Sequence, residues 1–204
     1  RALETGMEMA ALRAQEGYHI LCAGEMGIGN TTSAAAVTAA FLGVPPEVVT
    51  GRGAGLSGEG LARKTEVVRR ALALHCPDPS DPVDVLSKVG GLDIAGMAGL
   101  YLGGARCGVP VVMDGVISAA AALAAVRLCP LAKDYILASH QSAEPAGRLL
   151  LDALGMHPFL TAGLRLGEGT GAVAAVGLLD LVLAVYHGMV SFDDAGIEAY
   201  QPLT

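Results

Sequence analysis

Residues 18–32 read YHILCAGEMGIGNTT, and this stretch decides the fold. It begins with an apolar run over residues 18–23, which is typical of a short buried strand. A glycine-rich turn follows at residues 24–30 and carries one acid, Glu25. Asn30 is a natural N-cap for the alanine-rich helix expected at Thr31–Leu42. The stretch therefore predicts a strand, a tight turn and a helix in direct succession.

The same alternation of short apolar runs and helical patterns continues on both sides of this stretch. Helices are expected at Leu3–Glu16, Thr31–Leu42, Gly58–His75, Val83–Val89, Ile94–Gly104, Ile117–Leu128, through Leu149–Leu154 and at Gly171–Met189, and strands at Tyr18–Ala23, Val48–Thr50, Val109–Met113 and Tyr135–Ala138. Strands that alternate with helices indicate an α/β fold, namely a three-layer, Rossmann-like parallel sheet with helices on both faces.

Four polar or glycine-rich turns follow the expected strands, after Ala23, Thr50, Met113 and Ala138. In a parallel sheet the carboxyl ends of the strands meet at one edge, and ligands bind beyond that edge. The four turns are therefore expected to converge on one site.

Composition excludes several classes of protein. The net charge of −7 and the lack of a Lys/Arg cluster argue against nucleic acid as a partner. The four cysteines form no C-x-x-C pair and the histidines show no H-x-x-x-H spacing, so reduced thiols and no zinc site are expected. We find no signal-peptide pattern and expect a cytoplasmic protein. The chain starts at Arg1 rather than Met, so we expect an N-terminal part to be missing.

The segment Thr170–Val190 is nearly all apolar and long enough to resemble a membrane span. It contains Asp180, His187 and several glycines, which a membrane span disfavours. We therefore expect a buried core helix there and no membrane partner.

The turn at residues 24–30 leaves backbone N–H groups free at a helix start, which makes it a candidate anion site. It matches neither the G-x-G-x-x-G pattern nor a Walker A loop, and a steric need for glycine in a tight turn explains it equally well. Glu25 favours a functional role, because an acid beside an anion site is unfavourable unless it binds a hydroxyl or a proton. Lys64, on the helix after the Gly51–Leu56 turn, either lies on a solvated face or binds a phosphate.

A second turn of the same kind, RLGEGTG at residues 165–171, holds Glu168 between two glycines at a helix entrance. As a capping acid Glu168 would contribute about 0.3–1 kcal/mol through the helix dipole. Alternatively, it accepts a proton. Asp93 and Asp114 are either caps or sugar contacts, and His140 is expected to be a satisfied loop histidine.

Six segments together resemble the nicotinate-nucleotide–dimethylbenzimidazole phosphoribosyltransferase family, which acts in the assembly of the lower ligand of cobalamin. They are Gly24–Thr32, Gly51–Leu56 with Lys64, KVGGLDIAGM at 88–97, VVMDGVISAAAA at 111–122, ASHQSAEP at 138–145 and LRLGEGTGA at 164–172. The resemblance runs in order to about Met189. Family members are much longer, and their extra part lies upstream of Arg1, where it supplies part of a small domain and residues around the benzimidazole.

The resemblance implies an activity and a set of site residues. The family transfers 5-phosphoribose from nicotinate mononucleotide to 5,6-dimethylbenzimidazole with inversion, as a homodimer, without a metal or other cofactor. Glu168 matches the catalytic base, and Glu25, Gly27 and Lys64 match the nucleotide site, with Gly27 and Lys64 near the phosphate. The further positions that match the pocket lining are Asp93, Asp114, Gly115, Ser142, Leu166 and Gly167. Residues 1–190 would form the large α/β nucleotide-binding catalytic domain, and 191–204 a C-terminal tail belonging to the small domain.

Two other hypotheses remain open. A non-catalytic nucleotide-binding domain would use its acids only to cap helices and would bind nicotinate mononucleotide without turnover. A dinucleotide-dependent oxidoreductase is disfavoured, because the G-x-G-x-x-G motif and an obvious ribose-binding acid after a second strand are both missing.

Overall fold

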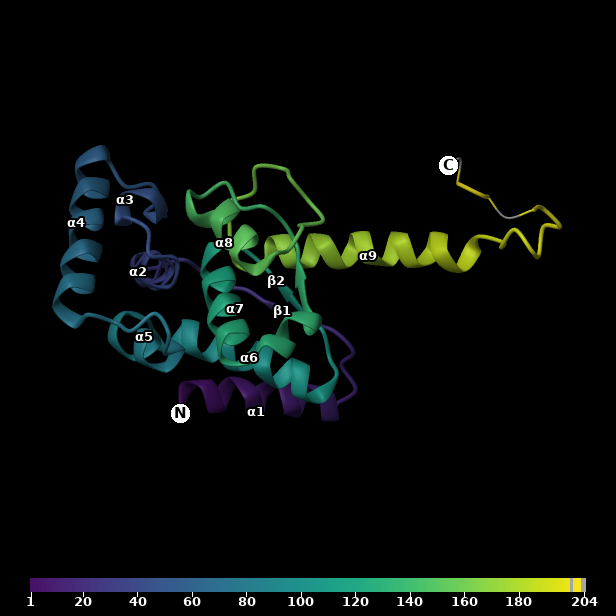
Figure 1. Cartoon of the computed structure of the whole chain (residues 1–204), viewed down its shortest axis with the longest axis horizontal. Helices are drawn as coiled ribbons and strands as arrows, with labels where there is room; N and C mark the ends of the chain where they lie inside the picture. Colours follow the sequence, from purple (N-terminus) through teal and green to yellow (C-terminus); the bar gives the residue numbers. More distant parts are fainter. Residues whose placement is uncertain (199, 203–204) are drawn as a thin grey trace.

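The computed structural model describes residues 1–198 and 200–202. Within these residues the helices are α1 (Ala2–Gln15), α2 (Thr31–Leu42), α3 (Pro46–Val49), α4 (Gly58–His75), α5 (Pro82–Val89), α6 (Leu92–Cys107), α7 (Val116–Leu128), α8 (Ala146–Leu154) and α9 (Thr170–Gly188), with a 3₁₀ segment, η1, at Pro130–Tyr135. The strands are β1 (Leu21–Ala23), β2 (Val111–Met113) and β3 (Ile136–Ala138). Figure 1 shows the helices gathered around the short sheet, with α9 projecting from it.

The three strands form one parallel sheet in the order β1-β2-β3. Ala23 pairs with Met113, and Met113 pairs with Ala138, so all three strands end at one edge. The expected α/β fold with helices around a parallel sheet is confirmed. The first strand is shorter than expected, because only Leu21–Ala23 of the apolar run pairs with β2.

The two faces of the sheet are covered to different extents. Val111 and Met113 point into the main core, which is built from α2, α6, α7 and α8. Val112 points to the other face and packs there against Ala172 and Ala175 at the start of α9. Side chains alternate between the faces of a strand, so each face needs its own cover. On the second face that cover is the first turns of α9.

The strand expected at Val48–Thr50 is wrong, since Val48 and Val49 belong to the short helix α3 and Thr50 is its C-cap. Pro46 occupies the first turn of α3, where its fixed backbone angle favours a helix. The Thr50 hydroxyl donates to the Pro46 carbonyl at 2.6 Å and closes this turn. The two prolines thus override the β preference of the valines. The turn that follows still reaches the sheet edge.

The burial expected for the closing helix is also wrong. α9 has the expected bounds within one residue at each end, but only Gly171, Ala172 and Ala175 are buried. Among the described residues, α9 is the one helix that is long and apolar enough, by length and composition, to cross a membrane. Its most apolar 18-residue stretch has a mean hydropathy of 1.7, and 17% of that stretch is buried. Apolar periodicity identified the helix, but it does not report which other elements lie against it.

Candidate active site

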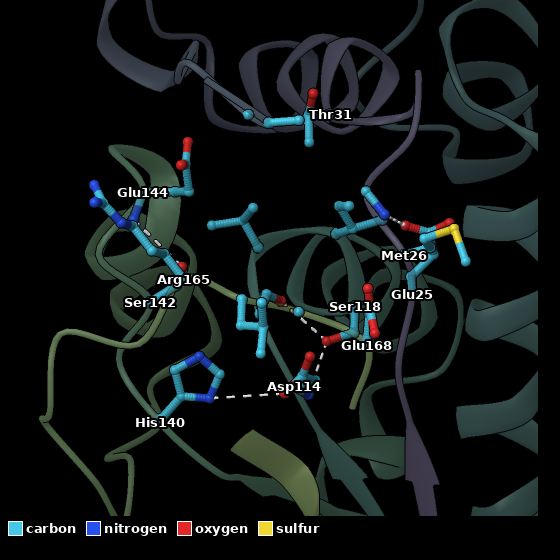
Figure 2. Close-up of a pocket in the computed structure, with 18 residues that line it drawn as sticks. Glu25, Met26, Thr31, Asp114, Ser118, His140, Ser142, Glu144, Arg165 and Glu168 are labelled. Atoms are coloured by element: carbon cyan, nitrogen blue, oxygen red, sulfur yellow. Dashed lines mark hydrogen bonds and ion pairs between the residues drawn. The ribbon is translucent and has the colours of Figure 1, made fainter. Parts of the chain in front are cut away.

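A cavity of about 320 Å³ opens at the carboxyl edge of the sheet. This volume lies at the lower end of the range for small-molecule sites. The loops that follow the three strands supply most of its wall, together with the turn after Gly51 and the second glycine-rich turn (Figure 2). The lining residues are Glu25, Met26, Gly27, Thr31, Gly53, Ala54, Asp114, Gly115, Val116, Ile117, Ser118, His140, Ser142, Glu144, Arg165, Leu166, Gly167 and Glu168.

Glu168 reaches the cavity from the loop that enters α9. Its backbone has a φ of 59°, in the left-handed region that residues other than glycine rarely adopt. The Glu168 N–H donates to the Glu25 carbonyl at 2.7 Å, which joins the two glycine-rich turns. The side chain is exposed at the cavity, so its carboxylate is available to a ligand.

In the first glycine-rich turn, the Glu25 carboxylate is bound by a backbone amide of the same turn. The Gly27 N–H donates to Oε2 of Glu25, so this amide is not free for an anion as the sequence suggested. Both residues nevertheless line the cavity. Glu25 is thus fixed in orientation while its second oxygen accepts no bond from a described residue.

Asn30 does not cap α2, contrary to the expectation from sequence. It occupies the N-cap position, but its side chain makes no capping bond and its Nδ2 donates to Asp93 Oδ2 at 2.6 Å. The amides in the first turn of a helix have no partner within the helix. In α2 they also lack a side-chain cap, and Thr31, the first residue of α2, lines the cavity.

Lys64 lies behind the cavity wall rather than in it. The side chain is buried, and Nζ donates to Thr31 Oγ1 at 2.8 Å and to the Gly51 carbonyl at 2.9 Å. Burial lowers the pKa of Lys64, and the nearby Glu144 carboxylate opposes this effect. Because Thr31 Oγ1 accepts from Lys64, the Thr31 O–H remains free to donate to a ligand.

Asp114 lies at the end of β2 and its side chain is buried. It lines the cavity, but its carboxylate accepts hydrogen bonds from the backbone at the start of α9. The sequence left open whether Asp114 caps a helix or contacts a sugar. The structure places it as a cap on a helix that is distant in sequence.

The structure brings together eight of the ten residues singled out from the sequence. The residues found in the cavity wall are Glu25, Gly27, Asp114, Gly115, Ser142, Leu166, Gly167 and Glu168. Lys64 lies behind the wall, where it donates to the lining residue Thr31. Asp93 does not line the cavity: it is exposed at the start of α6, and its carboxylate accepts a hydrogen bond from Asn30.

Sequence reasoning missed several polar lining residues, of which Thr31, Glu144 and Arg165 are the most notable. Arg165 is the first residue of the second glycine-rich turn and Thr31 directly follows the first, so their place at these turns was an available signal. Arg165 is the one Lys or Arg in the described wall, which also contains four carboxylates.

His140 follows β3, and only 4% of its surface is exposed. Its Nδ1 lies 2.9 Å from Ser139 Oγ. The same atom lies 3.9 Å from Asp114 Oδ1 (Figure 2). Burial lowers the pKa of His140, and the Asp114 carboxylate opposes this effect. The expectation of a hydrogen-bonded loop histidine agrees with the Ser139 contact, but the same residue also forms part of the cavity wall.

No group of three or more His, Cys, Asp and Glu side chains within the described residues is arranged to hold a metal ion. The wall therefore offers separate carboxylates, hydroxyls and one guanidinium. Such a wall is suited to binding a polar organic ligand and accepting a proton from it.

Comparison with known proteins gives consistent matches. A phosphoribosyltransferase family model matches residues 1–197. The nicotinate-nucleotide–dimethylbenzimidazole phosphoribosyltransferase of Acetivibrio thermocellus is 49% identical over 201 residues, which are 98% of this chain and 57% of the relative. That of Geobacter sulfurreducens is 50% identical over 196 residues, which are 96% of this chain and 56% of the relative.

A solved structure matches as well. The crystal structure of CobT from Thermus thermophilus superposes with a TM-score of 0.89 at 47% identity, covering 97% of this chain and 59% of that chain. The present chain thus spans somewhat more than half the length of the relatives it matches.

Proposed function

The chain belongs to the nicotinate-nucleotide–dimethylbenzimidazole phosphoribosyltransferase family, and on this basis we propose that it transfers 5-phosphoribose from nicotinate mononucleotide to 5,6-dimethylbenzimidazole. The bond between C1′ and the pyridinium nitrogen breaks, and nicotinate leaves with the electron pair. One benzimidazole nitrogen bonds to C1′ through its lone pair, and the N–H of the other nitrogen gives its proton to a base, giving α-ribazole 5′-phosphate for the lower ligand of cobalamin. The chain would then act as a pentosyltransferase.

The observation that carries the proposal is the presentation of Glu168 at the cavity. The leaving group departs as a neutral pyridine and needs no acid, whereas the incoming imidazole N–H needs a base. Glu168 supplies one carboxylate on a loop whose backbone is held from several sides. General base catalysis of this kind typically contributes a factor of about 10²–10⁴.

The start of α2 is the place where the phosphate would bind. The uncapped amides of the first turn and the partial positive charge of a helix N-terminus favour an anion. The Thr31 hydroxyl is a further donor, and the Lys64 ammonium adds positive charge one layer behind it. A phosphate held here at a distance from C1′ would use its binding energy to orient the reacting carbon.

The experiment that tests the proposal is product analysis by mass spectrometry after mixing the protein with nicotinate mononucleotide and dimethylbenzimidazole. It would be run on this chain and on a form extended upstream of Arg1 to a natural Met start. We expect α-ribazole phosphate from the extended form. Product from the shorter chain as well would place all essential chemistry within these residues. No product from either would favour the non-catalytic binding domain.

The Glu168→Gln variant gives this assay its sharpest comparison. The amide keeps the shape of the side chain but does not act as a base, so turnover is expected to fall at least about 100-fold. Binding of nicotinate mononucleotide, measured by calorimetry, should be retained. Glu66→Gln, at an exposed position on α4, is the matched control with unchanged turnover. Near-normal turnover of Glu168→Gln would remove this residue from the mechanism.

We further propose that the protein works as a cytoplasmic homodimer, with residues 1–190 forming the large catalytic domain and 191–204 belonging to a small one. The exposed apolar side chains of α9 support the proposal that another protein segment packs over this helix. Its start is fixed to the cavity wall through Asp114, and it contains Asp180 and His187. These features suit a helix that packs against protein rather than lipid.

A further inference from the structure

Asp114 binds the start of α9 through three backbone amides. Its Oδ1 accepts from the Gly171 N–H at 2.8 Å and the Ala172 N–H at 3.1 Å, and its Oδ2 accepts from the Gly169 N–H at 3.1 Å. Gly169, at the N-cap position of α9, has no side chain with which to cap the helix. The amides of the first turn, which need external partners, are therefore satisfied by a carboxylate from the end of β2.

Glu168 directly precedes the first of these three amides. Its left-handed backbone, with a φ of 59°, is uncommon for a residue with a side chain and persists only where the surroundings fix it. Its own N–H is bound by the Glu25 carbonyl. The loop is thus fixed on one side by the end of β1 and on the other by the end of β2.

Two close approaches restrict the same loop further. A Cβ on Gly24 would lie 2.5 Å from the Cα of Gly169, so the turn after β1 touches the loop with its backbone. A Cβ on Gly171 would overlap the His140 ring and lie 2.9 Å from Asp114 Oδ1. A shift of the loop toward either side is therefore blocked.

We infer that Asp114 is a positioning residue that sets the place of the Glu168 carboxylate by binding the amides of Gly169, Gly171 and Ala172. This inference rests on the proposed function, in which Glu168 is the base. Only 3% of the surface of Asp114 is exposed and both of its oxygens accept from the protein backbone, so we assign it no contact with the sugar. Its own N–H donates to Ser118 Oγ at 2.8 Å, which anchors the residue to the first turn of α7.

The test is Asp114→Asn in the form of the enzyme that shows turnover. An amide presents one oxygen, and its NH₂ group would face a backbone N–H, so at least one of the three bonds is lost. We expect kcat to fall about 10- to 100-fold, because small misplacements of a reacting group cost this much. The dissociation constant of nicotinate mononucleotide should stay within about twofold, since the phosphate would bind at α2.

Asp81→Asn is the matched control. Asp81 caps α5 by accepting from the amides of Val83 and Asp84, the same chemistry outside the cavity wall. The kcat of the Asp81→Asn variant should equal that of the unchanged enzyme even if the stability of the variant is lower. A kcat for Asp114→Asn within twofold of the unchanged enzyme would overturn the inference while leaving the proposed function intact. A loss confined to nucleotide affinity would also overturn it, because Asp114 would then be a ligand contact.

Amide hydrogen exchange provides a second readout that does not depend on turnover. The amides of Gly169, Gly171 and Ala172 should exchange slowly, and Asp114→Asn should accelerate them. Rapid exchange at all three in the unchanged protein would overturn the inference whatever the assay shows. If Asp114→Asn does not fold, Asp114→Glu takes its place, because it keeps the charge but displaces it by one methylene. Failure of the proposed function itself would appear separately, as absence of turnover in the unchanged enzyme.

Discussion

At the scale of single residues, Lys64 is a buried cation that would act on a bound phosphate through a neighbouring hydroxyl. Its ammonium lies beneath the wall and binds Thr31 Oγ1 and the Gly51 carbonyl. The Thr31 hydroxyl, which reaches the cavity, is thereby fixed as a donor. A phosphate at the start of α2 would meet this hydroxyl and the helix amides, with the positive charge close behind them.

Lys64→Met is expected to weaken nicotinate mononucleotide binding about tenfold or more, while nicotinate riboside, which lacks the phosphate, should be little affected. Methionine keeps the apolar stem but removes the charge, and a hydrogen bond to a charged group contributes about 1.5–3 kcal/mol. Isothermal calorimetry with the two ligands measures the difference. Lys88→Met, which removes a lysine that bonds Asp84 and does not line the cavity, is the control. An equal loss of affinity for both ligands would show that Lys64 has a purely structural role.

At the scale of elements, the start of α9 is a tightly packed junction. The helix meets the sheet through Ala172 and Ala175, and its first turn meets His140 and Asp114. Small residues in this turn allow the helix to approach the end of β3 closely. The rest of α9 makes few such contacts, so the two halves of one helix should respond differently to the same substitution.

Gly171→Ala is expected to destabilise the protein by about 1–3 kcal/mol, the usual cost of overpacking a well-filled site. Its methyl group would overlap the His140 ring. Gly177→Ala, in the same helix, meets open space and should be neutral or stabilising by up to about 1 kcal/mol, since alanine is the better helix former. Urea unfolding measures both variants. Adding His140→Ala to Gly171→Ala should recover part of the loss, and a purely additive double variant would contradict the steric explanation.

At the scale of the whole molecule, the projecting part of α9 exposes a row of large apolar side chains. Leu181, Val182, Val185 and Tyr186 are each more than half exposed. Soluble proteins rarely leave such a patch uncovered, so it marks a surface that binds protein or lipid. Figure 1 shows this part of the helix directed away from the sheet.

The isolated chain is therefore expected to self-associate in dilute buffer through α9. Leu181 and Val185 lie four residues apart on one face, so replacing both with Glu should shift the population toward monomer in analytical ultracentrifugation. Leu74→Glu, at an exposed apolar position on α4, should leave association unchanged. A monomeric unchanged chain would contradict the expectation. Binding to neutral lipid vesicles that the double variant abolishes would instead point to a lipid cover.

The sequence by itself determined the order of most elements and the two glycine-rich turns that line the cavity. Helices such as Thr31–Leu42 and Gly58–His75 were bounded correctly, because local periodicity and turn residues specify them. Glu25 and Glu168 were singled out because each lies among glycines in a turn at the start of a helix, and both line the cavity. The segment at Val48–Thr50 was misjudged, because the conformational restriction of two prolines outweighed the β preference of two valines.

Only the tertiary structure decided how these pieces meet. Contacts between Asn30 and Asp93, Lys64 and Thr31, and Asp114 and Gly171 join residues from 33 to 63 positions apart, and no local pattern specifies such partners. The exposure of α9 was unpredictable for the same reason, since burial depends on what packs against a helix and not on its own apolar residues. The sequence thus placed Glu25, Asp114 and Glu168 on turns, and packing brought all three to one cavity and joined Asp114 to the start of α9.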